Sequence, residues 1–224
     1  MRANWETPAG RLLRTLSEAV HNHGLRLERP ILVFRSAPLQ ICLDPAFLSA
    51  DGHIASAGYR EVIKGLVDEL GLSKDKAAFY IEVVGEHVFR PGPKWRERAE
   101  ATMLNGVTFL FPHPTDVLVA KLYRLEEKDL RAFNLVLVKS GHPTAEEMIL
   151  ELRDCFEKFR PELDGSKSEF WKNVEKLWPL IYRSPIDVKS TILKPVLAEL
   201  QEVGYYPNYL DALSSDVDAP DSNA

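Results

Sequence analysis

The chain has 224 residues, of which 45% are hydrophobic and 27% are charged, and its formal net charge is −5 at pH 7. This composition is that of a globular protein with an ordinary core, and the negative charge excludes binding of DNA or RNA by bulk charge alone. No apolar run approaches the roughly 18 residues that a membrane-spanning helix needs, so no membrane span is expected.

The N-terminal sequence pattern and the two cysteines indicate which cellular compartment is expected. Arg14, Glu18 and His21 interrupt the first apolar pattern, so we predict no secretory signal and a cytoplasmic location. Cys42 and Cys155 lie far apart with no Cys or His at ligand spacing, which argues against a zinc site and a disulfide framework.

The first half of the chain contains both helical and strand patterns. Apolar residues at helical spacing predict helices over 10–23 and 59–70. Short β-branched and aromatic runs predict strands over 30–34, 77–84 and 106–111. We therefore predict an α/β (α+β) lobe over residues 1–113.

After residue 113 the patterns are helical. Thr115 can cap a helix that runs to residue 130, and Thr144 with Glu147 forms a capping box that opens a helix to about residue 159. Further helices fit 169–182 and 186–203. These segments predict a helical lobe over 114–210, and the acidic composition of 211–224 predicts a disordered tail.

Three cations fall on one side of the helix predicted to end at residue 130. At 100° per residue, Lys121, Arg124 and Lys128 lie within about 60° of each other. One interpretation is a solvated helix face whose Lys and Arg stems cover apolar neighbours. The other is an anion-binding edge, with Asp129 orienting Lys128 or a neighbouring helix.

The run from Gly106 to Leu130 resembles a segment of the nucleotidyltransferase superfamily, in bacterial proteins of the abortive-infection and toxin-antitoxin type. There a strand leads into a Pro-x-x-Leu-x-x-x-Lys-Leu helix, followed by a Lys-Asp pair, and the matching positions are Pro114, Lys121, Leu122 and Lys128-Asp129. The resemblance implies a mixed sheet flanked by helices, with Lys121 on a nucleotide phosphate and Asp129 supporting it. Arg124 and Lys128 would add to the nucleotide site.

A second part of the resemblance lies near the N-terminus. Residues 31–37 are similar to a strand followed by a Gly-Gly-Ser-Ala turn, and the resemblance implies that Ser36 binds the nucleotide. Phe34 and Arg35 occupy the two glycine positions, where bulky residues fill space that a triphosphate needs. Asp51 and His53 match the two acids of a metal motif, although histidine is a poor magnesium ligand. The third acid is Glu82, so the resemblance implies Mg²⁺ on Asp51 and Glu82. The alternative for 49–53 is a plain surface turn.

Three functions follow. The first is a metal-dependent nucleotidyltransferase that moves a nucleotide from a nucleoside triphosphate to a protein or RNA hydroxyl, with Asp51, Glu82 and Lys121 as catalytic residues. The second is a catalytically inactive module of that fold that binds a nucleotide, a toxin or an antitoxin. The third is self-association through the aromatic helix over 169–182. No zinc-hydrolase pattern, nucleophilic serine motif or phosphate loop is present in the sequence.

Overall fold

The computed structural model describes residues 3–48, 51–127, 129–158 and 169–204. Its contacts divide the chain into two compact units. The first comprises the chain up to Lys121 together with Glu127–His142, and the second comprises Leu122–Glu126 with the residues from Pro143 onward. The tail predicted over 211–224 lies outside the described residues.

A five-stranded mixed sheet forms the centre of the first unit, in the order β3-β2-β1-β5-β4. The pairs β1–β5 and β2–β3 are parallel, whereas β1–β2 and β4–β5 are antiparallel. The strands are β1 (Ile31–Phe34), β2 (Asp51–Ser56), β3 (Tyr80–Val83), β4 (Glu100–Leu104) and β5 (Val107–Phe111). The expected α/β class, a mixed sheet flanked by helices, is confirmed.

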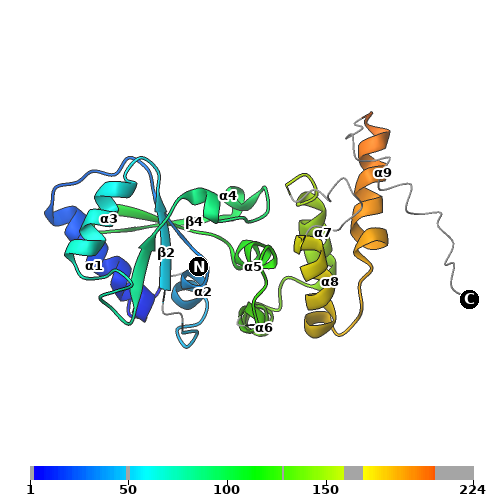
Figure 1. The fold of residues 1–224 in the computed structure, drawn as a ribbon, viewed down its shortest axis with the longest axis horizontal. Helices are drawn as coiled ribbons and strands as arrows, with labels where there is room; N and C mark the ends of the chain where they lie inside the picture. The colour runs from blue at the N-terminus through cyan, green and yellow to red at the C-terminus, as the bar shows by residue number, and fades with distance from the viewer. Residues whose placement is uncertain (1–2, 49–50, 128, 159–168, 205–224) are drawn as a thin grey trace, which may run out of the picture. The chain divides into compact units, whose positions relative to one another are not determined.

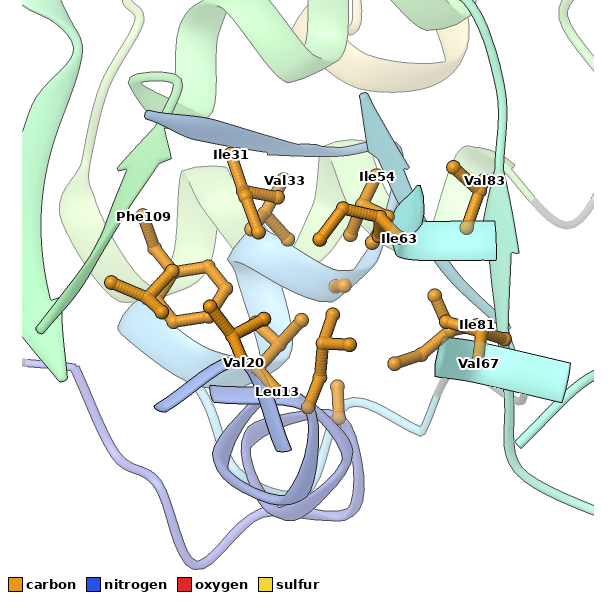
Figure 2. Close-up of a cluster of buried hydrophobic side chains, with 14 of the residues drawn as sticks. Leu13, Val20, Ile31, Val33, Ile54, Ile63, Val67, Ile81, Val83 and Phe109 are labelled. Atoms are coloured by element: carbon orange, nitrogen blue, oxygen red, sulfur yellow. The ribbon is translucent and has the colours of Figure 1, made fainter. Parts of the chain in front are cut away.

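The main core lies on one face of this sheet, under helices α1 (Pro8–Asn22) and α3 (Arg60–Glu69) (Figure 1). Alternate residues of the strands point to this face, as the period of two requires. They meet the apolar stripes of the two helices, and Figure 2 shows Leu13 and Val20 of α1 facing Val33 and Phe109. Helix α2 (Ala37–Cys42) adds Ala37 and Ile41 to the same cluster.

A smaller core covers part of the opposite face. Phe89 and Trp95 pack there against Phe34, with ring centroids 5.3 Å apart for both Phe34–Phe89 and Phe89–Trp95. They belong to the segment between β3 and β4, which contains the 3-10 helix η1 (Glu86–Val88) and the short helix α4 (Trp95–Arg98).

The prediction of one continuous cationic helix that runs to residue 130 is wrong. Two helices occupy the region, α5 (Pro114–Leu122) and α6 (Asp129–Ser140), and Leu125 between them has a left-handed backbone with φ 40°. Helix α5 begins at Pro114, and the Thr115 amide donates to Nδ1 of His113 at 3.3 Å, so Thr115 is not the cap. Lys121 and Arg124 therefore do not share one helical stripe, and Lys128 lies outside the described residues.

The second unit contains helices in its described part, in agreement with the expected helical region. They are α7 (Ala145–Asp154), α8 (Glu169–Tyr182), the π-helix η2 (Lys189–Leu193) and α9 (Lys194–Glu202). The capping box of Thr144 and Glu147 is confirmed. Trp171 and Trp178 of α8 are buried, so neither indole is presented for self-association. Across the described ranges, no helix is both long and apolar enough to cross a bilayer.

Candidate functional site

The turn after β1 begins the candidate site. Arg35 there has φ 62°, a left-handed backbone that favours glycine over every other residue. Ser36 follows as the N-cap of α2, but its side chain makes no capping hydrogen bond. The turn thus keeps a shape suited to glycine while carrying an arginine side chain.

Three polar residues lie beside this turn on the face of the sheet opposite α1 and α3. His53 of β2 stands in register with Phe34 of β1 and with Glu82 of β3, and Asp51 is two residues before it on the same face. The sheet register therefore brings Asp51, His53 and Glu82 together. Asp51 opens a strand, so the alternative of a surface turn at this residue is wrong, and residues 49 and 50 lie outside the described part.

The imidazole of His53 lies between the two carboxylates. Its Nδ1 is 3.3 Å from Oδ2 of Asp51, and its Nε2 is 2.8 Å from Oε2 of Glu82. Neither fully buried nitrogen makes a hydrogen bond of regular geometry within the described residues, although Glu82 lies close enough to Nε2 to act on its pKa as a hydrogen-bond partner. A buried polar group in this state is uncommon in proteins and marks a site under constraint.

The charge of His53 follows from its surroundings. Burial, followed by the positive charge of Arg35, lowers the pKa of the imidazole from its usual 6.5 to about 4. The carboxylates of Asp51 and Glu82 oppose this shift without overcoming it. His53 is therefore neutral at pH 7.

Arg35 lies next to this group. Its Nη1 is 3.8 Å from Oδ2 of Asp51, at the outer limit of an ion pair. The side chains are 37% exposed for Arg35 and 30% exposed for Asp51, so solvent reaches both partners of the pair. Such a pair holds the guanidinium loosely.

Lys121 of α5 forms the other half of the site. Its Nζ donates to Oδ1 of Asp129 at 2.6 Å and to Oγ of Ser36 at 3.2 Å. The lysine side chain is 11% exposed and that of Asp129 only 3%, so this ion pair is nearly dry. Asp129, the first residue of α6, thereby joins α6 to α5 and to the turn after β1.

A second buried ion pair positions α5. Asp116 in its first turn is fully buried and receives two hydrogen bonds from Arg98, at 2.6 Å from Nη2 and 3.2 Å from Nε. This two-point contact fixes the helix against the end of α4. The sequence reasoning missed this pair, and also missed the contact of Arg35 with Asp51, because neither follows from spacing along the chain.

The site residues expected from the sequence separate into two groups. Asp51 and Glu82 belong to one set of contacts, with His53 and Arg35. Ser36, Lys121 and Asp129 form a second set, and the two sets adjoin because Arg35 and Ser36 are neighbours in the chain. Arg124 lies beyond the end of α5 and pairs with Glu126 at 2.8 Å. Lys128 lies outside the described residues.

The acids do not fit the magnesium site that the resemblance implies. Mg²⁺ requires oxygen ligands at about 2.0–2.1 Å in octahedral geometry. Here Asp51 and Glu82 each face a different nitrogen of one imidazole, and Asp51 also faces Arg35. Within the described ranges, no group of three or more His, Cys, Asp or Glu side chains is arranged to hold a metal ion.

Comparison with known proteins assigns no family to the chain. No protein-family model matches it, and no curated protein and no solved structure matches it either.

Proposed function

We propose that this chain is a nucleotidyltransferase-like binding module, which holds a nucleotide through its phosphates and does not transfer it. The observation that carries the proposal is the set of contacts from Glu82 through His53 and Asp51 to Arg35. Asp51 and Glu82 stand where the resemblance expects metal ligands, but the side chains of His53 and Arg35 beside them disfavour a bound metal ion.

The convergence of distant residues supports the superfamily relationship. Ser36 after β1 contacts Lys121 on the helix after β5, and Arg35, the residue before Ser36, contacts Asp51. Asp51 and Glu82 in turn both contact His53. The left-handed turn at Arg35 is a further support, since the superfamily has glycine at that place.

The loss of transfer follows from the side chains between these positions. Nucleotidyl transfer needs two or three carboxylates that jointly hold a metal ion, which bridges the phosphates and activates the attacking hydroxyl. The neutral ring of His53 lies between the two acids, and the guanidinium of Arg35 competes with a cation for Asp51. Both features lower the affinity for Mg²⁺, while the half-exposed guanidinium of Arg35 remains available to attract phosphate.

The proposal is tested by measuring binding and transfer separately. Thermal unfolding of the purified chain is followed with each of the four nucleoside triphosphates, and incorporation of the same labelled nucleotides into the protein and into bulk RNA is followed with Mg²⁺ or Mn²⁺. We expect at least one nucleotide to raise the melting temperature, and no label to be incorporated.

Two variants locate the effect. Arg35→Ala is expected to lose the thermal shift, whereas Arg60→Ala, an exposed arginine at the start of α3, keeps it. Incorporation that disappears in Asp51→Asn and Glu82→Gln would establish the transferase instead. The absence of a shift with all four nucleotides would refute the binding function.

A further inference from the structure

Among the cations of the candidate site, Arg35 is the one that an anion from solvent can reach. Lys121 is almost buried and bonded to Asp129 at 2.6 Å, so its charge is already balanced. Arg35 is 37% exposed, and its contact with Asp51 is 3.8 Å long. A phosphate group approaching the turn would therefore meet the guanidinium first.

The chemistry of this pair suits an exchange of anions. A guanidinium presents a planar fork of donors that matches two phosphate oxygens, and such charge-assisted contacts are stronger than a long ion pair. Asp51 is 30% exposed, so its carboxylate can return to water when a phosphate displaces it. The pair is a resting state in which Asp51 occupies the place of the ligand.

We infer that Arg35 supplies the positive charge that a metal ion supplies in a catalytic site, so that a phosphate-bearing ligand binds without a divalent cation by displacing Asp51. The inference rests on the proposed binding function and specifies how it works. It assigns Asp51 as a competitor of the ligand, where the resemblance makes it a ligand of the metal.

The probes are inorganic tripolyphosphate and the nucleoside triphosphate that gives the largest thermal shift. Binding is measured by isothermal titration calorimetry in EDTA and, separately, in excess Mg²⁺. We expect the affinity in EDTA to equal or exceed that in Mg²⁺, because Mg²⁺ neutralises the phosphates that Arg35 attracts.

Variants of the two partners should shift the affinity in opposite directions. Arg35→Gly removes a charge-assisted contact and is expected to weaken binding in EDTA by about tenfold to a hundredfold. Asp51→Asn removes the competing charge and is expected to tighten binding in EDTA by about twofold to fivefold. Arg60→Ala is the matched control and should leave both affinities as in the wild type.

Two results would overturn the inference while leaving the binding function intact. One is binding that occurs only with Mg²⁺. The other is a loss of binding in Asp51→Asn, which is what a metal ligand at this position predicts. Melting curves of each variant, recorded without ligand, show whether a loss of affinity comes from unfolding. No binding of either probe in any buffer would remove the proposed function as well.

Discussion

Replacing Arg35 with glycine and with alanine isolates the strain in the turn after β1. Arg35 has φ 62°, and a left-handed backbone costs an L residue roughly 1–2 kcal/mol. Glycine avoids this cost but loses roughly 0.5–1 kcal/mol more conformational entropy on folding. Both substitutions remove the contact with Asp51, so that term cancels between them. We therefore expect Arg35→Gly to be more stable than Arg35→Ala by about 0.5–1 kcal/mol.

Lys64 provides the matched control. It is exposed within helix α3, where an ordinary helical backbone makes alanine more stable than glycine by about 1 kcal/mol. The order of the two variants should thus reverse between position 35 and position 64. Scanning calorimetry measures the difference, since 1 kcal/mol moves the melting temperature of a chain of this size by about 2–4 °C. If Arg35→Ala equals or exceeds Arg35→Gly in stability, residue 35 does not have a left-handed backbone and the resemblance to a glycine turn fails.

The remaining predictions concern the buried groups. Because the unfolded chain protonates His53 near pH 6.5 and the folded chain only near pH 4, its contribution to stability is present above pH 6.5. On acidification from pH 6.5 to pH 4 the free energy of unfolding should fall by up to about 1.4 kcal/mol per pH unit because of this group. Urea titrations of the wild type and of His53→Asn at several pH values measure the fall, and parallel pH profiles for the two proteins would contradict it. Lys121→Met should cost about 3–5 kcal/mol in the same assay, since it leaves the buried Asp129 without its lysine, and a loss below about 1 kcal/mol would indicate an ordinary surface pair. Gly10→Ala should destabilise by about 1–3 kcal/mol, because its Cβ would lie 2.5 Å from the Asn4 carbonyl oxygen. Gly65→Ala in α3 has open space and should stabilise by about 1 kcal/mol, and melting temperatures that change in the same direction for both glycines would refute this comparison.

Elements with a local cause could be predicted from the sequence. The continuous apolar run at 31–34 predicts a strand buried on both faces, and β1 is fully buried. The capping box at Thr144 and Glu147 satisfies two backbone amides with side chains three residues apart, so its signal needs no tertiary context. Both features are found at the predicted place.

The break between α5 and α6 has no such local signal. Leu118, Leu122 and Leu125 continue a helical period, yet the helix ends at Leu122 and Leu125 has φ 40°. The reversal lets Asp129 reach Lys121, eight residues earlier, at 2.6 Å. A periodicity argument cannot detect a contact of this kind, because it arises from two helices that pack against a shared turn.

Strand β2 was missed for a related reason. Its first residues, Asp51 and Gly52, are a common turn dipeptide, but β1 and β3 pair with it on both sides. Hydrogen bonding from two neighbours outweighs the weak local preference for a turn. The candidate site depends on this strand, so the sequence could name Asp51 and Glu82 but could not place His53 between them.

The two departures from the pattern that the resemblance implies, at positions 35 and 53, balance each other in charge. A site with three carboxylates and one divalent cation carries a net charge of about −1 on simple counting. Here His53 is neutral, Asp51 and Glu82 are two acids, and Arg35 is one cation, which gives the same net charge without a metal. An aspartate at position 53 beside Arg35 would require a metal that the guanidinium repels, and a glycine at position 35 beside His53 would leave two acids without a counter-charge. Under the proposed binding function, the neutral histidine and the fixed cation of the arginine are therefore expected together, because either one alone would change the net charge of the site.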